Sequence, residues 1–294
     1  MFIGIDIGGT GIKFGVVNEK GEILKKESIP TKKTTEDIIE DLVSVCSKLM
    51  KEYNVTRIGA ASPGIVTNGV IQAPGNLPFR YTPLVKILEE RLNLPVTLAN
   101  DAHCAALAEA TVGAGKGTQS MIMLTLGTGV GGAIVIDGKI YKGHGGGAGE
   151  FGHGIFQRDG IPCPCGRKGC FEQYASITAL INQTKNATKQ NPNSVLAKIC
   201  EETKTINGKT VFEALDQNCP VAKKVYDQYV SYLAEGIDSF TLLLQPELVV
   251  LGGAISQQGD RLIAPLQEKL GNVVTVKAAS LGGDAGIIGA VLNK

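Results

Sequence analysis

Residues 2–17 read FIGIDIGGTGIKFGVV, an apolar run, a glycine turn and a second apolar run. The first run has the length and content of a buried strand over residues 2–6, and residues 12–18 resume as a second strand. After a turn of sequence NEKG, residues 22–29 alternate as a third strand. We therefore expect three antiparallel strands to open the protein.

A second copy of this unit begins near residue 120. Residues 120–126 are an apolar run that ends in the glycine turn 127–129, and two further strands follow at residues 133–136 and 139–141, separated by the turn pair Asp137 and Gly138. Two copies of one strand–turn–strand unit predict two related lobes. We place the first lobe at residues 1–112, joined by a C-terminal helix at 284–294, and the second at 113–283.

The rest of the chain alternates helix and strand patterns. Strands are expected at residues 56–61, 96–99 and 248–251, and helices at residues 35–52, 83–92, 101–112 and 284–292 and within 176–244. This alternation places the protein in the α/β class.

Composition excludes several classes of protein. The chain has 294 residues and 38 glycines, but the glycines lack a period of three and apolar runs recur throughout, which excludes collagen and disorder. A net charge of +1 leaves no basic footprint for nucleic acid. The chain shows no leader pattern and no stretch of about 18 apolar residues, so we expect a cytoplasmic protein without a membrane anchor, its seven cysteines kept as thiols.

The two glycine turns are candidates for phosphate binding. GTGVGG at residues 127–132 matches the G-x-G-x-x-G pattern, but a dinucleotide-binding fold requires a helix after it, and here a strand follows. A Walker A loop fails as well, because Lys116 is followed by Gly117. What remains is a pair of turns whose backbone N–H groups can approach phosphate oxygens. Ordinary tight hairpins are the alternative.

Asp6 and Lys13 flank the first glycine turn. A carboxylate near phosphates repels them unless Mg²⁺ intervenes, so a metal-organising role is the sensible one for Asp6. Lys13 is either a phosphate contact or an outward-facing strand lysine.

Asn100 and Asp101 follow an apolar strand and begin a helix. Asp is among the commonest N-cap residues, which is one interpretation of Asp101. The other makes Asp101 a general base at the carboxyl end of a strand, where ligands gather in open α/β sheets.

A third cluster has the spacing His-x9-Cys-x-Cys-x4-Cys, formed by His153, Cys163, Cys165 and Cys170. Three thiolates and one imidazole match a closed, tetrahedral, structural zinc site. Scattered buried thiols, or a disulfide with a spare thiol, are the alternatives. His103 and His144 belong to no comparable cluster of Cys and His in the sequence.

Together these motifs resemble the bacterial sugar kinases of the ROK family (repressor, open reading frame, kinase), within the actin-like ATPase superfamily. The resemblance covers essentially the whole chain. It implies two actin-like (ribonuclease H-like) α/β lobes with a cleft between them and a small zinc-binding loop at residues 153–170. The sequence departs from the usual family pattern at Gly11 and Ala133, neither of which is a proposed ligand.

The resemblance also assigns residue roles. Asp101 is the expected catalytic base, and the metal ligands are those of the zinc cluster. The residues expected to hold the sugar are Gly64, Asn76, Asn100, Asp101, Glu150, His153 and Glu172. The residues expected to bind the nucleotide are Asp6, Gly8, Gly9, Thr10, Lys13, Gly127, Thr128, Gly129, Gly252 and Gly253.

The implied reaction is transfer of the ATP γ-phosphoryl group to a hexose hydroxyl, with ATP, Mg²⁺ and a structural Zn²⁺ as cofactors and a homodimer as the assembly. Glucose, giving glucose 6-phosphate, is the first choice; N-acetylmannosamine, fructose and other hexoses are alternatives. A sugar-sensing transcription regulator or a non-catalytic sugar-binding protein is the alternative from another class. Regulators of the family carry a DNA-reading segment before the first phosphate loop, which here begins five residues after Met1, so we expect none.

Overall fold

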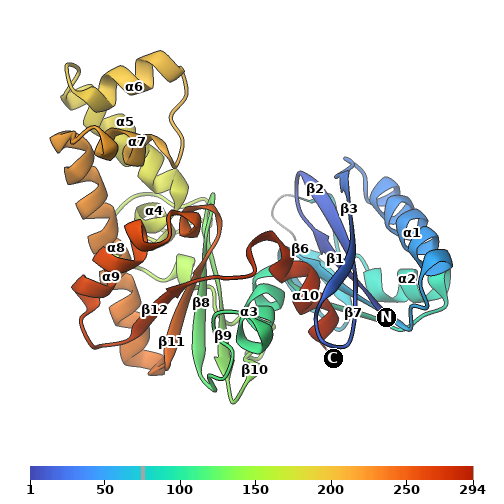
Figure 1. The fold of residues 1–294 in the computed structure, drawn as a ribbon. Coiled ribbons are helices and arrows are strands. Elements are labelled where there is room, and N and C mark those ends of the chain that lie inside the picture. Colours follow the sequence, from blue (N-terminus) through green and yellow to red (C-terminus); the bar gives the residue numbers. More distant parts are fainter. Residues whose placement is uncertain (74–76, 294) are drawn as a thin grey trace. The chain divides into compact units, whose positions relative to one another are not determined.

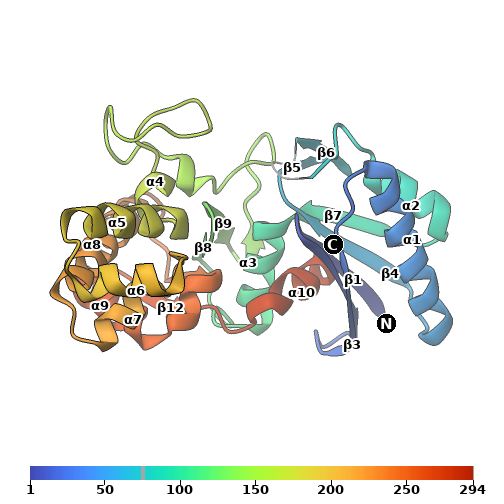
Figure 2. The ribbon, with the colours of Figure 1, turned by 90° about the horizontal axis from the view of Figure 1, so that it is seen from above.

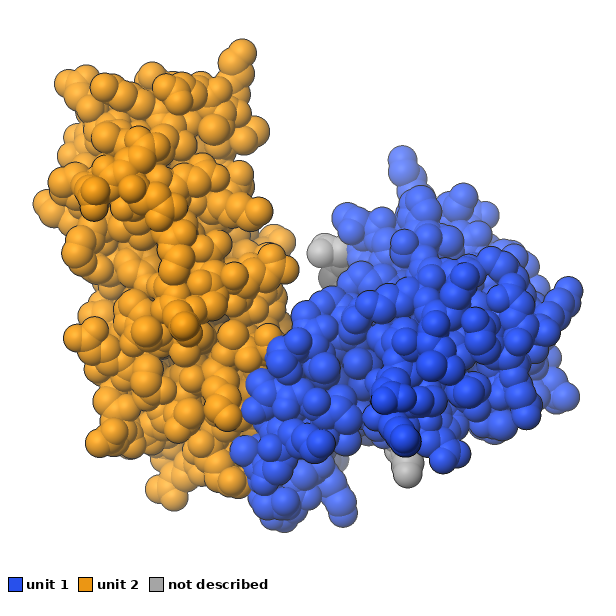
Figure 3. All heavy atoms as spheres, in the orientation of Figure 1, with its two compact units in different colours: residues 1–119, 133–149, 280–294 blue, residues 120–132, 150–279 orange. Residues whose placement is uncertain are grey.

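The computed structural model describes residues 1–73 and 77–293, which form two compact units. Unit 1 comprises residues 1–119, 133–149 and 280–294, and unit 2 comprises residues 120–132 and 150–279 (Figure 3). The predicted lobe boundaries stay a prediction, because a compact unit is defined by contacts and not by independent folding.

A five-stranded sheet forms the centre of unit 1, in the order β3-β2-β1-β4-β7 (Figure 1). Its strands are β1 (Phe2–Ile7), β2 (Gly11–Val17), β3 (Ile23–Pro30), β4 (Arg57–Ser62) and β7 (Val96–Asn100). The first three strands are antiparallel, as predicted, and β1, β4 and β7 are parallel. The carboxyl ends of the three parallel strands therefore lie at one edge of the sheet.

Helices cover both faces of this sheet. They are α1 (Thr35–Glu52), α2 (Leu84–Leu92), α3 (Asp101–Val112) and α10 (Ala285–Leu292), the last preceded by the 3-10 turn η3 (Gly282–Asp284). Ile3, Ile5 and Ile7 are fully buried in the core shared with α1 and α2. Because side chains alternate along a strand, Asp6 lies on the opposite face. That face carries α10, which lies beside α3 (Figure 2).

A short hairpin of β5 (Ile65–Thr67) and β6 (Val70–Ala73) follows β4. The sequence indicates a loop at Ser62-Pro63-Gly64 and gives no sign of the hairpin. Strands of three and four residues are too short to show an alternating pattern.

A second sheet repeats the strand order of the first. It runs β10-β9-β8-β11-β12, with β8 (Met121–Leu126), β9 (Val130–Ile136), β10 (Lys139–Ile140), β11 (Leu248–Gly252) and β12 (Thr275–Ala278). Each sheet thus places its first strand between its second strand and a later parallel one. The internal repeat predicted from the two glycine turns is confirmed by this shared topology.

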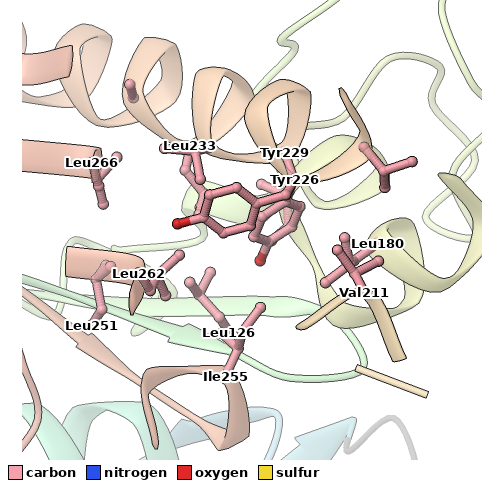
Figure 4. Close-up of a cluster of buried hydrophobic side chains, with 14 of the residues drawn as sticks. Leu126, Leu180, Val211, Tyr226, Tyr229, Leu233, Leu251, Ile255, Leu262 and Leu266 are labelled. Carbon is pink, nitrogen blue, oxygen red and sulfur yellow. The ribbon is translucent and has the colours of Figure 1, made fainter. Parts of the chain in front are cut away.

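By these unit bounds, β8, β11 and β12 belong to unit 2, whereas β10 and residues 133–136 of β9 belong to unit 1. The rest of unit 2 is helical. Its helices are η1 (Phe151–His153), α4 (Glu172–Ala175), α5 (Ile177–Gln190), α6 (Val195–Thr203), α7 (Thr210–Asp216), α8 (Pro220–Leu244), η2 (Ala254–Gln258) and α9 (Asp260–Leu270). Tyr229 and Leu233 of α8 pack with Leu126, Leu251 and Leu262 in the buried core (Figure 4). The Tyr229 hydroxyl donates to the Ala175 carbonyl over 2.8 Å, so its polar atom is satisfied inside the core.

Among the described residues, no helix combines the length and the apolar character that crossing a membrane requires.

Candidate functional site

The first glycine turn, residues 8–11, joins β1 to β2 and has the carbonyl groups of Gly8, Thr10 and Gly11 bonded within the protein. The Gly8 N–H donates to the Gly11 carbonyl over 3.0 Å. The Thr31 hydroxyl donates to the Gly8 carbonyl over 2.6 Å, and the Thr31 N–H donates to the Thr10 carbonyl over 3.3 Å. Gly9 and Thr10 are exposed. With these three acceptors held by the protein, the turn presents exposed backbone suited to an anion.

The second glycine turn, residues 127–129, joins β8 to β9 and is held in the same way. The Gly127 N–H donates to the Gly129 carbonyl over 3.0 Å. The start of α5 supplies the other two donors: the Ile177 N–H to the Gly127 carbonyl at 2.9 Å and the Thr178 hydroxyl to the Thr128 carbonyl at 2.7 Å. In both turns, the N–H of the first glycine donates to the carbonyl of the last, and donors from a later segment of the chain hold two further carbonyls.

Gly252 and Gly253 end β11 beside β8. Gly252 pairs with Thr125, and Gly253 has a φ of 86°. A Cβ atom on Gly253 would collide with the backbone of Leu126, the residue before the second glycine turn. The Gly253 carbonyl accepts from the Ser256 hydroxyl over 2.7 Å. Glycine at this position lets the chain pass directly against the base of the turn.

Asp6 lies opposite Lys13 in the β1–β2 ladder, and its carboxylate is 3.5 Å from the Lys13 ammonium. Lys13 also donates to the Gly283 carbonyl over 3.3 Å. Burial raises the pKa of Asp6, and the charge and hydrogen bond of Lys13 offset part of that shift. The Lys13 side chain thus turns back toward Asp6 and η3. It remains 48% exposed to solvent.

Asn100, and not Asp101, is the N-cap of α3. Its Oδ1 accepts from the His103 N–H over 3.1 Å, and its Nδ2 donates to the Gly64 carbonyl over 3.0 Å. The capping interpretation of Asp101 is therefore wrong. Asp101 is the first residue of the helix, where its Oδ1 accepts from the Ala102 N–H over 2.9 Å. The anchoring of the Gly64 loop by Asn100 was not predicted from the sequence.

The double role of Asn100 gives a testable difference between two substitutions. Asn100→Ala removes the cap, which should lower the free energy of unfolding by about 1–2 kcal/mol. Asn100→Asp keeps an acceptor for the His103 N–H and loses only the donor to Gly64, so its loss should be clearly smaller. Urea denaturation of the two variants measures the difference, and equal losses would contradict the capping role.

Asp6 and Asp101 both act on the buried thiol of Cys104. Burial raises the pKa of Cys104, the negative charges of Asp101 and Asp6 raise it further, and Lys142 lowers it. The carboxylates of Asp6 in β1 and Asp101 in α3 therefore both influence the same buried thiol. Lys142 belongs to no recognisable motif and was not predicted from the sequence.

Glu150 and Glu172 lie on either side of the cysteine-rich segment. Glu150 is exposed just before η1, and its carbonyl accepts from the His153 N–H over 3.0 Å. Glu172 begins α4, and its Oε2 accepts from the Val130 N–H over 2.9 Å. A Cβ atom on Gly129 would collide with the same carboxylate. Glu172 therefore holds the end of the second glycine turn in addition to the predicted role.

Four side chains of this segment converge on one point. The ligand atoms of His153, Cys163, Cys165 and Cys170 all lie within 4.8 Å of one another. Cys163 Sγ is 3.8 Å from His153 Nδ1, and Cys165 Sγ is 3.6 Å from Cys170 Sγ. Tetrahedral zinc with bonds of about 2.3 Å to sulfur sets sulfur atoms about 3.8 Å apart. All seven cysteines are free, so the disulfide alternative does not hold.

The chain around the four ligands is folded as a tight loop. The Cys163 N–H donates to the Arg167 carbonyl over 2.8 Å, and Gly166 and Gly169 have φ values of 89° and 76°. Hydrogen bonds from the backbone and side chain of Arg167 lower the pKa of Cys165 to about 6, which favours the thiolate that binds metals. Gln173 donates to Cys163 Sγ over 3.7 Å. The donor set therefore fits a metal ion.

The remaining predicted residue, Asn76, lies outside the described residues. Gly64 lies in the loop held by Asn100, with a φ of 90°. Unit 1 thus carries Asp6, Lys13, Asn100 and Asp101 near one sheet edge. Unit 2 carries the second glycine turn, Glu172 and the metal-binding loop. The roles predicted for these residues stay predictions.

Comparisons with known proteins all indicate the same family. The family model described as "ROK family" matches residues 2–292. A glucokinase of Streptomyces coelicolor is 38% identical, with 98% of this chain and 95% of the relative covered. An N-acetylmannosamine kinase of Escherichia coli is 32% identical, with 99% and 97% covered.

A solved structure supports the same family assignment. The ROK family glucokinase of Streptomyces griseus, in complex with glucose and AMPPNP, superposes with a TM-score of 0.84 at 34% identity, covering 98% of this chain and 97% of that one. The predicted α/β fold and family are therefore confirmed. This chain belongs to the ROK family.

Proposed function

We propose that this chain, an ATP-dependent sugar kinase of the ROK family, transfers the γ-phosphoryl group of ATP to the 6-hydroxyl of glucose, with Asp101 as the general base. The observation that carries the proposal is that Asn100 and Asp101 have different positions at the start of α3. Asn100 caps the helix, so the Asp101 carboxylate is not needed for that bond. It stands at the strand edge where Asp6 and the first glycine turn also lie.

The chain's own residues position the reactants, which is most of what phosphoryl transfer requires. The two glycine turns would hold phosphate oxygens through backbone N–H groups, with Gly252 and Gly253 on the adenosine side. Glu150, Glu172, Asn100 and His153 would hold sugar hydroxyls, with the loops at Gly64 and Asn76 beside them. Asp101 would take the proton of the attacking hydroxyl as the new bond to phosphorus forms.

Asp6 fits the requirement for Mg²⁺. It is a carboxylate beside the first glycine turn, and the ammonium of Lys13, 3.5 Å away, offsets part of the rise in its pKa that burial causes. When bound, Mg²⁺ neutralises developing phosphate charge. Asp6 would orient the ion, and Lys13 would hold Asp6 while remaining available to phosphate.

The packing of α10 against Asp6 makes this role testable. A Cβ atom on Gly286 would lie 2.7 Å from the Asp6 Cγ, so Gly286→Ala must displace the carboxylate. Alanine favours a helix over glycine by about 1 kcal/mol, so the helix itself should tolerate the change. We expect kcat with Mg²⁺-ATP to fall about tenfold, because small misplacements cost large factors in rate.

Gly283→Ala is the matched control. Its Cβ atom would lie 3.4 Å from the flexible Lys13 ammonium and should leave kcat near that of the wild type. Steady-state kinetics over a Mg²⁺ series measures both variants. A normal kcat in Gly286→Ala would exclude Asp6 from the metal-organising role.

The four ligands of the metal-binding loop would hold a structural zinc ion. A closed set of three thiolates and one imidazole leaves no position for substrate, so zinc would supply rigidity and no chemistry. His153 faces Cys163 through Nδ1, so the ion would fix its tautomer and leave Nε2 for a sugar hydroxyl.

The choice of glucose as substrate rests on the names of the relatives, which include a glucokinase and an N-acetylmannosamine kinase. The test is a coupled assay of ADP release with glucose, mannose, fructose, N-acetylglucosamine and N-acetylmannosamine, compared by kcat/KM. We expect glucose to give the highest value. A higher value for another sugar would replace glucose and keep the kinase, whereas sugar binding without ADP release for all of them would favour the sensor. The homodimer stays a prediction from the resemblance.

A further inference from the structure

A pocket of about 480 Å³ lies within unit 2, where one side of α5 faces Gln173 of α4 and Ile161 of the metal-binding loop. Sites for small molecules usually have volumes of about 300–1,000 Å³, so the pocket is large enough for a monosaccharide derivative. The proposed reaction uses none of the residues that line it.

The pocket carries positive charge. Lys185 and Lys189 line it one helical turn apart on α5, and both are exposed. Neither forms an ion pair with any residue that the structure describes. Residues 173–200 contain these two lysines and Lys198 but no acidic residue. Because no carboxylate of this segment neutralises the lysines, the pocket attracts an anion.

Amides supply the other polar groups of the pocket. Asn182 and Asn186 lie on the same face of α5 as the two lysines, at helical spacings of three and four residues. Gln183 Nε2 donates to the Tyr174 carbonyl over 2.9 Å, which directs the amide oxygen away from that carbonyl. This Oε1 is buried and accepts a hydrogen bond from no described residue. The lining therefore contains an acceptor that the protein itself does not use, which is uncommon for a buried polar atom.

The lining indicates the chemistry of a ligand. An ammonium group is a point charge that binds phosphate, and an amide both donates and accepts, which suits hydroxyl groups. Among the described residues, no aromatic side chain lines the pocket, so it offers no ring on which a nucleoside base would stack. A small phosphate ester with several hydroxyl groups matches both kinds of side chain.

We propose that this pocket is a second ligand site, built from residues that the proposed reaction does not use, and that it binds a small hydroxylated phosphate ester such as a sugar phosphate. Lys185 and Lys189 bind the phosphate, and the amides of α5 bind hydroxyl groups. Gln173 connects the site to the metal-binding loop, because its Nε2 also donates to Cys163 Sγ over 3.7 Å. The inference does not depend on the proposed function.

Isothermal titration with glucose 6-phosphate tests the site. The best sugar of the panel is present at saturation, so that it occupies the catalytic site. The double variant Lys185→Gln/Lys189→Gln removes both charges and should weaken binding at least about tenfold. Lys198→Gln is the matched control, because Lys198 is an exposed lysine of α6 outside the pocket, and its Kd should stay within about twofold of the wild-type value. Equal Kd values in the double variant and the control would overturn the proposal.

Three simpler probes separate the two parts of the ligand. Inorganic phosphate lacks the hydroxyl groups, gluconate lacks the phosphate, and sorbitol lacks the charge, so each should bind at least about tenfold more weakly than glucose 6-phosphate. Asn182→Ala/Asn186→Ala should weaken the binding of glucose 6-phosphate and leave that of inorganic phosphate unchanged. Any simpler probe that binds as tightly as glucose 6-phosphate would overturn the proposed ligand class.

Acetylation of lysines, located by mass spectrometry, maps the site on the wild-type protein. Glucose 6-phosphate should slow the modification of Lys185 and Lys189 and leave that of Lys198 unchanged. Protection of all three lysines, or of none, would overturn the inference. A wild-type protein that phosphorylates no sugar would refute the proposed function instead, and the protection pattern would still decide whether the second site exists.

Discussion

Asp101→Asn is expected to lower kcat about 10³-fold while leaving the Kd for sugar nearly unchanged. A positioned general base contributes about 10²- to 10⁴-fold to a rate, and an amide of the same shape cannot take up the proton. The fold should survive because Asn100 caps α3, and the bond that Asp101 makes to the Ala102 N–H has an equivalent acceptor in the amide oxygen.

The control for Asp101→Asn is Asn100→Asp, which changes the neighbouring residue in the opposite chemical sense. It should keep a measurable kcat and weaken sugar binding, because it releases the Gly64 loop from its donor. Stopped-flow or steady-state kinetics with isothermal titration of the sugar separates the two effects. Wild-type turnover in Asp101→Asn would refute the base assignment.

Cys170→Ser is expected to reduce bound zinc from about one ion per chain to nearly none and to lower kcat/KM about 100-fold or more. Cys170 is fully buried among the four ligands, and a hydroxyl is a poor substitute for a thiolate. The loop lies between Glu150 and Glu172, so its collapse would disturb both. Since Glu172 also holds Val130, the second glycine turn should loosen as well.

Cys200→Ser is the matched control, because Cys200 is half-buried in α6 and lies outside the cluster. It should keep the zinc and the activity. Elemental analysis of protein purified without chelators, with thermal unfolding of both variants, provides the measurement. A wild-type chain without zinc would remove the structural site from the account.

Local patterns predicted most of the fold. α1 spans the residues that its apolar spacing indicates, and Thr34 caps it through the Asp37 N–H at 3.1 Å. Both glycine turns and the repeat were readable because each motif lies within one stretch of chain. α9 and β12 were not assigned, since α9 contains Pro265 and β12 has only four residues.

What the sequence could not show depends on contacts between distant residues. Neighbouring Asn100 and Asp101 are both capping types, and only the backbone geometry shows which of them caps. The bond from Val130 to Glu172 spans 42 positions, and Asn100 reaches the Gly64 loop. No periodicity or motif encodes such pairs, so the residues that hold the site in place were the ones missed.

The central claim, that this chain moves the γ-phosphoryl group of ATP onto a hexose, is tested most directly by ³¹P NMR of the wild-type protein with Mg²⁺-ATP and glucose. We expect the signal of the γ-phosphate to be replaced by the signals of ADP and of one sugar phosphate monoester in equal amounts. In Asp101→Asn, no conversion should be visible on the same timescale. ATP that stays intact, or is hydrolysed to free phosphate with glucose and every other hexose of the panel, would contradict it.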